Sequence, residues 1–296
     1  MASELGSLEL RRLAAEMNAT NSSGEQRDVQ KAVILARGLG KRMRSADLSA
    51  GLSDEQLHAA DAGVKAMIPV GRPFLDYVLS ALADAGIRKI CLVIGPEHSA
   101  IREYYGSLAL RRVQIQYAIQ ERAIGTANAL LSAREFAGND SFLSLNSDNY
   151  YPVEVFKALR ALGEPGLPAF EKQSLLRESN IPEERLRAYA LLRIGEFGYL
   201  AEIVEKPDAL TESSPGKPVF ISMNCWRFDS AIFRACEHVP RSARGEFELP
   251  EAVQYGIANL GLRLKAVPFG AGVLDLSRRS DIASVAARLR DVSVNL

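Results

Sequence analysis

Cysteine and histidine are scarce in this sequence, with three of each among 296 residues. An odd and low number of cysteines argues against a disulfide framework and favours a reducing, cytoplasmic environment. The three histidines, His58, His98 and His238, have no zinc-ligand spacing among themselves or with the cysteines. The sequence also lacks the motifs of a nucleophile elbow and of a helical zinc protease. Hydrolysis by a catalytic triad is therefore not expected.

The chain also has no formal net charge at pH 7, because 36 lysine and arginine residues balance 36 aspartate and glutamate residues. Proteins that bind nucleic acids or anionic membranes rely on a basic surplus, so neither partner is expected. No apolar stretch is long enough to span a bilayer, and the first residues lack the continuous apolar region of a signal peptide. With 47% hydrophobic residues, the chain can bury the core of one large α/β domain.

Residues 1–29 are expected to form a flexible N-terminal arm. The apolar residues near its start suit one short helix, and residues 18–24 have the small, polar composition of a linker. Residues 30–296 are expected to form a single domain, since they contain neither an internal repeat nor a low-complexity tract.

Strand and helix patterns alternate from residue 31 onward, which is typical of a mainly parallel sheet covered by helices on both faces. After residue 148 the strands become shorter and are separated by glycine and proline turns, which indicates antiparallel additions. The expected fold is therefore α/β, with a Rossmann-like, mainly parallel but mixed sheet. The charged segment 170–187 is not expected to form a strand pair. The predicted strands are 32–36, 90–95, 113–120, 142–148, 188–194, 200–205, 219–228 and 262–268, and the predicted helices are 73–85, 99–105, 126–136, 153–162, 230–239 and 247–259.

The first predicted strand runs into a glycine-rich, basic segment that we call the glycine loop. Its sequence is Leu35-Ala36-Arg37-Gly38-Leu39-Gly40-Lys41-Arg42-Met43. Glycines let backbone N–H groups approach a polyphosphate, and basic side chains neutralise its charge. The P-loop motif is excluded because Leu35 and Arg42 occupy its required glycine and hydroxyl positions. The dinucleotide fingerprint is excluded because Met43 occupies its third glycine position. Taken alone, a tight turn with solvated charges explains the segment equally well.

A second polar segment, Asn146-Ser147-Asp148-Asn149, follows the apolar part of a predicted strand, Phe142–Leu145. Open α/β sheets bind ligands at the carboxyl ends of their strands, so this segment and the glycine loop belong to the same edge. A carboxylate near a polyphosphate is a plausible Mg²⁺ ligand, because Mg²⁺ prefers hard oxygen ligands together with substrate phosphates. Taken alone, Asp148 is better explained as a helix cap before Pro152. Together with the glycine loop, the role of metal ligand is favoured.

Two further loops carry groups suited to a nucleobase and to a phosphate. Gln120 ends a predicted strand, and its amide can both donate to and accept from a nucleobase edge, while Gly125 lets a base approach the backbone. The alternative is an ordinary strand-to-helix loop with Thr126 as its N-cap. Lys206, in Glu205-Lys206-Pro207, offers a point charge for a phosphate monoester, or is simply a solvated lysine at a strand end.

In their order, these motifs resemble those of the sugar-1-phosphate nucleotidylyltransferases. Each motif is short, but the ordered set is specific, and the resemblance covers roughly residues 30–282. The segments that carry it are Gly38-Leu39-Gly40-Lys41-Arg42, Lys65-Ala66-Met67-Ile68-Pro69-Val70, Gln120 with Gly125-Thr126-Ala127, Ser147-Asp148-Asn149, Glu205-Lys206-Pro207, Ser222-Met223-Asn224-Cys225-Trp226-Arg227-Phe228-Asp229 and Val273-Leu274-Asp275.

The resemblance implies a nucleotide-binding half, residues 30–150, and a sugar-binding half, residues 151–296. It implies that Arg42 holds the triphosphate, Lys65 reaches its α-phosphate region and Lys206 binds the sugar phosphate. It also implies that Mg²⁺ is the cofactor and that Asp148 and Asp275 hold it. The implied catalytic residues are Arg42, Lys65, Asp148 and Lys206. The implied nucleotide and sugar contacts are Ala36, Arg37, Gly38, Leu39, Gly40, Lys41, Gln120, Gly125, Thr126, Glu205 and Asn224.

The implied reaction is attack of a sugar-1-phosphate oxygen on the α-phosphorus of a nucleoside triphosphate, with pyrophosphate leaving. A phosphate monoester is already a competent nucleophile, so catalysis consists of in-line positioning and neutralisation of charge. Gln120 and Gly125 suit uracil or thymine, which favours UTP or dTTP. The other interpretations are a non-catalytic nucleotide-sugar-binding regulator and a GT-A-like glycosyltransferase. The oligomeric state stays open, with a homo-oligomer as one option.

Two features depart from the family pattern. Arg37 stands where the family usually has the first of two adjacent glycines, and its side chain either adds a phosphate contact or crowds the ribose. Residues 48–62 resemble an insertion, which would form an active-site lid or a docking surface.

Overall fold

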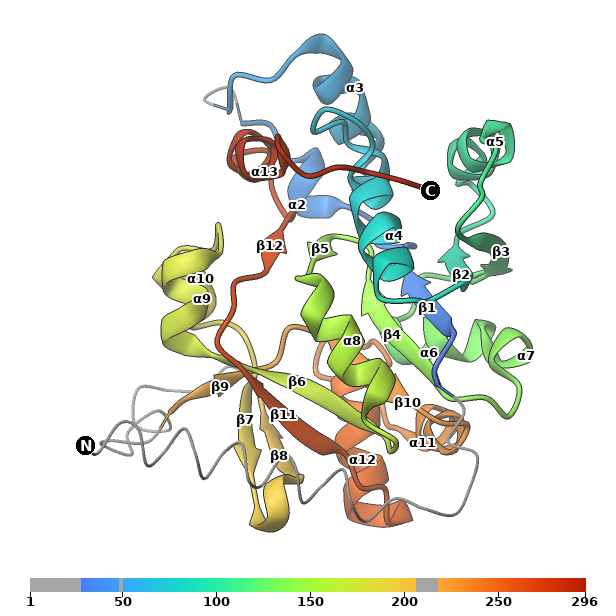
Figure 1. The fold of residues 1–296 in the computed structure, drawn as a ribbon, viewed down its shortest axis with the longest axis vertical. Coiled ribbons are helices and arrows are strands. Elements are labelled where there is room, and N and C mark those ends of the chain that lie inside the picture. Colours follow the sequence, from blue (N-terminus) through green and yellow to red (C-terminus); the bar gives the residue numbers. More distant parts are fainter. Residues whose placement is uncertain (1–27, 48–49, 206–217) are drawn as a thin grey trace.

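The computed structural model describes residues 28–47, 50–205 and 218–296, and Figure 1 shows their arrangement. Two predictions fall outside these ranges: nearly all of the N-terminal arm predicted at 1–29, and the phosphate-binding role of Lys206.

Ten strands of the described residues form the main sheet: β1 (Lys31–Leu35), β2 (Lys89–Ile94), β3 (Gln114–Ile119), β4 (Phe142–Asn146), β6 (Gly166–Glu171), β7 (Leu191–Ile194), β8 (Leu200–Val204), β9 (Phe220–Ile221), β10 (Cys225–Phe228) and β11 (Lys265–Phe269). Their order is β3-β2-β1-β4-β10-β6-β9-β7-β8, with β11 paired to β6. Strands β3, β2, β1 and β4 run parallel to one another, and β10 joins β4 antiparallel. The predicted α/β fold with a mixed sheet is confirmed.

Strand β1 shows why the sheet is covered on both faces. Its side chains alternate between two apolar clusters, with Ala32 and Ile34 in one and Val33 and Leu35 in the other. Successive residues of a strand point to opposite faces, so a strand that is apolar throughout must be buried on both. The helices supply that cover.

Helices lie on each side of the sheet, as Figure 1 shows. One apolar cluster contains side chains of α4 (Phe74–Asp84), α5 (Ser99–Ser107), α8 (Val153–Ala161) and α13 (Asp281–Leu289). The other contains side chains of α6 (Thr126–Ser132), α11 (Ala231–His238) and α12 (Leu249–Leu260). The remaining elements are α2 (Lys41–Arg44), α3 (Asp54–Ala62), η2 (Lys65–Met67), α7 (Arg134–Ala137), β5 (Asn149–Tyr150), α9 (Lys172–Glu178), α10 (Glu183–Leu186), η3 (Glu196–Gly198) and β12 (Leu274–Asp275).

Two predicted elements are divided in the structure. The strand predicted at 219–228 is two strands, β9 and β10, because Asn224 between them has a φ of 55°. This left-handed conformation, which asparagine tolerates better than most residues, does not continue a strand. The helix predicted at 126–136 is likewise two helices, α6 and α7.

Strand β6 and helix α13 were not predicted at all. Gly166 and Pro168 lie within β6, and both residues normally argue against a strand in the interior of a sheet. β6 nevertheless pairs with β10, β9 and β11. The charged segment 170–187 contains the end of β6 and then forms α9 and α10. Its charged residues belong mainly to these short helices.

The predicted insertion at 48–62 contains helix α3. Its N-terminus has a capping box, in which Ser53 Oγ accepts from Gln56 N and the Gln56 side chain accepts from Ser53 N. Arg279, just before α13, donates to Asp61 on α3 and to the carbonyl oxygens of Met43 (2.9 Å) and Arg44 (3.3 Å). The C-terminal segment therefore ties α3 to the end of the glycine loop, at the top of Figure 1.

We expect Arg279→Met to lower the free energy of unfolding by about 2 kcal/mol, because hydrogen bonds to a charged group contribute about 1.5–3 kcal/mol and this side chain is buried. Urea unfolding measures the change. Arg193→Met is the control, because its ion pair with Glu202 is exposed and should contribute far less. Equal effects of the two variants would contradict the proposed tie.

Candidate functional site

The predicted nucleotide-binding residues line one cavity of about 410 Å³ at the carboxyl edge of the parallel strands. The glycine loop follows β1, Gln120 follows β3 and Asp148 follows β4. The structure therefore brings together loops that are far apart in the sequence, as expected for an open α/β sheet. The lining includes Ala36, Arg37, Gly38, Leu39, Gly40, Lys41, Arg42, Lys65, Gln120, Gly125, Thr126 and Asp148.

Close backbone packing explains two of the glycines. Gly40 has a φ of 61°, and a Cβ there would lie 2.2 Å from the carbonyl oxygen of Gly63. Gly125 has a φ of 118°, and its Cβ would lie 2.3 Å from the carbonyl oxygen of Phe247. Any other residue at these positions would push the loops apart. Met43 is fully buried and anchors the end of the glycine loop in the core.

The amide of Gln120 has a fixed orientation. Its Nε2 donates to the carbonyl oxygen of Gly125 (3.0 Å) and to Asn128 Oδ1 (2.9 Å), so both of its hydrogens have acceptors. The group left for a ligand in the cavity is the oxygen Oε1, which is an acceptor. Thr126 is not the N-cap of α6, since Gly125 occupies that position. Thr126 Oγ1 instead accepts from the backbone N–H of Leu249 and links α6 to α12.

A second cavity of about 510 Å³ adjoins the first. It contains the predicted sugar-binding residues Glu205 and Asn224 together with Asp275. Asp148 lies at the junction, because it lines both cavities. The residues common to both linings are Arg42, Thr126, Asn146, Asp148 and Arg244.

Lys65 and Asp148 form an ion pair at this junction, with 2.7 Å between Lys65 Nζ and Asp148 Oδ2. Lys65 comes from η2 and Asp148 from the loop after β4, so the pair joins two predicted catalytic residues from separate segments. Both side chains keep some exposure to the cavity. They present a cation and an anion side by side where the two cavities meet.

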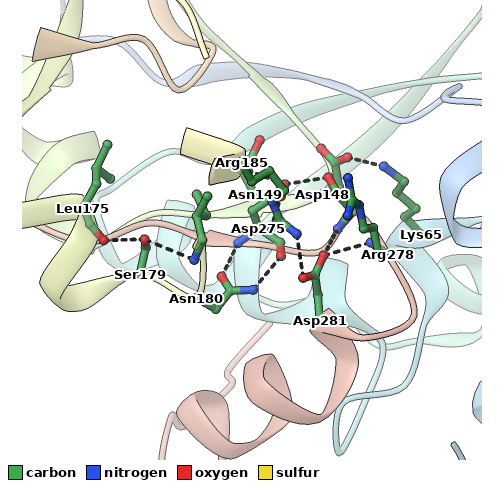
Figure 2. Close-up of polar contacts among 12 residues, drawn as sticks. Lys65, Asp148, Asn149, Leu175, Ser179, Asn180, Arg185, Asp275, Arg278 and Asp281 are labelled. Carbon is green, nitrogen blue, oxygen red and sulfur yellow. Dashed lines mark hydrogen bonds and ion pairs between the residues drawn. The ribbon is translucent and has the colours of Figure 1, made fainter. Parts of the chain in front are cut away.

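Asp275 lies beside Asp148 because β12 pairs with β5. In this pairing Asp275 is opposite Asn149, and the backbone N–H of Leu276 donates to the carbonyl oxygen of Asp148. Figure 2 shows the polar contacts around the two carboxylates. Asp275 Oδ1 accepts from Asn149 Nδ2 (3.2 Å) and Ser277 Oγ (2.9 Å), and Asp275 Oδ2 pairs with Arg185 (2.6 Å).

Burial, and then the charge of Asp148, raise the pKa of Asp275 to about 6, against an opposing effect of Arg185. Two carboxylates that repel each other in this way favour an added cation between them. Mg²⁺ is commonly held by one or two carboxylates together with substrate phosphates. Among the described residues no set of three His, Cys, Asp or Glu side chains is placed to hold a metal. The carboxylate pair thus fits Mg²⁺ that is shared with a phosphate ligand.

The lining residues that the sequence analysis missed include Arg185, Tyr189 and Arg244. Arg244 lines both cavities and lies in a tight turn, in which Ser242 N donates to the carbonyl oxygen of Glu246. The run Arg-Gly-Glu ahead of a helix with proline in its first turn was a usable signal for this turn. Arg185 and Tyr189 carried no such signal, because their partners are distant in the sequence.

Arg37 has a partner within the protein. Its Nη2 lies 3.3 Å from both carboxylate oxygens of Glu97, in the loop after β2, and its side chain is largely buried. The guanidinium lies so close to Gly95 that a Cβ there would be 2.5 Å from Arg37 Nε. The side chain is therefore directed toward the end of β2. Neither predicted role, phosphate contact or crowding of the ribose, is tested by this arrangement.

No helix among the described residues has both the length and the apolar character needed to cross a membrane.

Comparison with known proteins gives consistent matches. The sequence pattern of the nucleotidyl transferase family matches residues 31–287. The UTP–glucose-1-phosphate uridylyltransferase AglF of Haloferax volcanii is 29% identical over 262 residues, which cover 88% of this chain and 97% of that protein. A glucose-1-phosphate thymidylyltransferase of Streptomyces griseus is 26% identical over 76% of this chain and 56% of its own length. The structure of a UDP-glucose pyrophosphorylase complexed with UDP-glucose has the same fold, with a TM-score of 0.68 at 17% identity over 90% of this chain and 100% of that chain.

The Lys65–Asp148 pair generates a test by pH. Replacing Lys65 by Met leaves the charge of Asp148 without this counter-ion, so the pKa of Asp275 should rise further above that of an unfolded carboxyl group. When folding raises the pKa of a carboxyl group, the group destabilises the folded state only at a pH above its pKa in the unfolded chain. The full loss of stability is reached above its pKa in the folded protein. We therefore expect Lys65→Met to lose about 1 kcal/mol more stability at pH 8 than at pH 4, in the absence of divalent ions.

Urea unfolding at both pH values measures this loss. The double variant Lys65→Met with Asp148→Asn removes both charges and should show no such pH dependence. A Lys65→Met variant with the same deficit at both pH values would show that the repulsion between Asp148 and Asp275 is unimportant.

Proposed function

The chain belongs to the nucleotidyl transferase family, and we propose that it transfers a nucleotidyl group from UTP or dTTP to a sugar 1-phosphate. The products are a nucleotide-diphosphate sugar and pyrophosphate. The observation that carries the proposal is the Lys65–Asp148 ion pair at the junction of two cavities. One cavity has the glycine loop, and the other has the hydrogen-bonding side chains of Glu205 and Asn224.

The sheet order supports one orientation of the nucleotide. Gln120 follows the edge strand β3, and Asp148 follows β4 on the other side of β1. A nucleotide with its base against Gln120 then directs its phosphates across the glycine loop toward Lys65 and Asp148. In this orientation the Gly38–Gly40 backbone, Arg42 and Arg244 lie along the phosphates.

The fixed amide of Gln120 supports a pyrimidine that carries an N3–H. Its available atom is the acceptor Oε1, which matches the N3–H donor of uracil and thymine. The corresponding nitrogen of cytosine is an acceptor and would face an acceptor. The named relatives include one uridylyltransferase and one thymidylyltransferase, in keeping with this preference.

The sugar 1-phosphate is proposed to lie in the second cavity, with its hydroxyl groups near Glu205 and Asn224. Lys206, adjacent in sequence to Glu205, is proposed to bind its phosphate. Asp148 and Asp275 are the proposed holders of Mg²⁺, which when bound neutralises charge on the phosphates. Lys65 and Arg42 offset the repulsion between two anionic substrates and position them in line. The protein needs no nucleophile of its own, because the sugar phosphate is the attacking group.

Pyrophosphate release tests the reaction. Each nucleoside triphosphate is combined with a panel of sugar 1-phosphates in the presence of Mg²⁺. We expect release that requires both substrates and is fastest with UTP or dTTP. Binding of nucleotide without release from any pair would support the non-catalytic regulator instead. Release of nucleoside diphosphate from a nucleotide sugar would support a glycosyltransferase.

We expect Arg42→Ala and Asp148→Asn each to lower the rate of pyrophosphate release by 100-fold or more, since loss of one group that stabilises transition-state charge costs about 10²–10³ in rate. Arg193→Ala is the matched control, because its side chain is exposed and pairs on the surface with Glu202. Full activity of Arg42→Ala would refute the assignment of the glycine loop to the triphosphate, and full activity of Asp148→Asn would refute its role in the metal site.

A further inference from the structure

Arg185 lies between two buried carboxylates. Its Nη2 is 2.6 Å from Asp275 Oδ2 and its Nη1 is 2.8 Å from Asp281 Oδ1. The Arg185 side chain is 10% exposed, and those of Asp275 and Asp281 are 4% and 7% exposed. Figure 2 shows the arginine reaching both of them. A buried arginine with two carboxylate partners is a strong, charge-assisted arrangement.

The contacts of Asp275 leave little capacity for another cation. Oδ1 has two neutral donors, Asn149 and Ser277, and Oδ2 has the charged guanidinium of Arg185. Asp148 differs, since its ion pair with Lys65 involves Oδ2 and its side chain is 21% exposed. A divalent ion near Oδ2 of Asp275 would lie next to the positive charge of Arg185, which disfavours it unless the arginine moves.

We propose that Arg185 is the resident counter-ion of Asp275 and competes with the divalent metal for this carboxylate. The inference rests on the proposed function, in which Asp148 and Asp275 hold the metal. It adds a positioning residue for the metal site that none of the sequence motifs contains. In the free enzyme the arginine satisfies Asp275, so the metal has full use of only Asp148. The metal is then held weakly until the substrate phosphates supply further oxygen ligands.

The surroundings allow Arg185 to leave Asp275 without leaving the site. Asp281 is fixed independently, because its Oδ2 accepts from the backbone N–H groups of Ser277 and Arg278. The arginine can therefore keep its bond to Asp281 while it releases Asp275. Arg185 also lines the second cavity, and its Nε is buried without a hydrogen-bond partner among the described residues. A displaced guanidinium thus has a polar cavity beside it.

Asp275 itself stays in place during such an exchange. Asn180 holds its backbone at two points, since Asp275 N donates to Asn180 Oδ1 and Asn180 Nδ2 donates to the Asp275 carbonyl oxygen, both at 2.8 Å. The exchange therefore concerns the Arg185 side chain rather than the position of the carboxylate.

Manganese binding to the nucleotide-free protein tests the proposal. Mn²⁺ shares the oxygen preference of Mg²⁺, and electron paramagnetic resonance counts the free ion directly. The main variant is the double substitution Arg185→Met with Asp281→Asn. It removes one positive and one negative charge, so the local net charge is unchanged and Asp275 is left without the arginine. The amide oxygen that Asp281→Asn introduces can still accept from the backbone N–H groups of Ser277 and Arg278.

We expect this double variant to bind Mn²⁺ about 10-fold to 100-fold more tightly than the wild type, the range that corresponds to loss of one competing charge-assisted hydrogen bond. Arg185→Lys retains the positive charge, so its affinity for Mn²⁺ should stay within about threefold of the wild-type affinity. Arg288→Met is the control, because Arg288 donates to the carbonyl oxygens of Glu178 and Ser179. It should leave the affinity unchanged.

Equal affinity of the wild type and the double variant would overturn the proposal while leaving the metal site intact. Weaker binding by the double variant would also overturn it, since Arg185 would then support the metal rather than compete with it. If the double variant does not fold, the Mn²⁺ affinity of the single variant Arg185→Met is compared with the wild type by the same criteria. Absence of Mn²⁺ binding by both the wild type and the double variant would instead refute the proposed metal site on which the inference rests.

Discussion

Repulsion between two neighbouring carboxylates, Asp148 and Asp275, is the constraint on which the rest of this site depends. The two side chains are far apart in the sequence, and β12 pairing with β5 places them side by side. Each carboxylate has a cation of its own, Lys65 for Asp148 and Arg185 for Asp275. Burial, as the larger cause, and the remaining repulsion from Asp148 together raise the pKa of Asp275 to about 6. The site is therefore ready to accept positive charge, and it is also the place where two anionic substrates would have to meet.

The C-terminal segment connects this electrostatic centre to the rest of the fold. Asp275 lies in β12, Arg279 donates to the carbonyl oxygens at the end of the glycine loop, and Asp281 anchors Arg185. One short stretch of chain thus contacts the glycine loop, the carboxylate pair and the wall of the second cavity. Its position explains how residues near the end of the sequence take part in a site that begins at β1.

Local patterns were enough to predict much of this arrangement. The glycine loop, Gln120 and Asp148 were proposed from short motifs, because each follows a parallel strand. Lys65, which lies in η2, was proposed only from the family resemblance. Strand β6 was missed because glycine and proline, here Gly166 and Pro168, normally argue against a strand. Its pairing with β10, β9 and β11 determines its conformation instead. Arg185 was missed because its partners, Asp275 and Asp281, are distant in the sequence. Arg244 was missed although the turn before α12 left a usable local signal. The division of the strand at 219–228 depends on the backbone of one residue, Asn224, which composition alone does not reveal.

The most direct test of the account is a crystal structure with Mn²⁺ and a nucleotide sugar, in which anomalous scattering locates the metal. The account predicts one anomalous peak about 2.0–2.2 Å from a carboxylate oxygen of Asp148 and in contact with the diphosphate, the distance expected for hard oxygen ligands. It also predicts that any bond from the metal to Asp275 is accompanied by displacement of Arg185 from that carboxylate. A metal bound elsewhere, or a metal on Asp275 with the Arg185 ion pair intact, would contradict it.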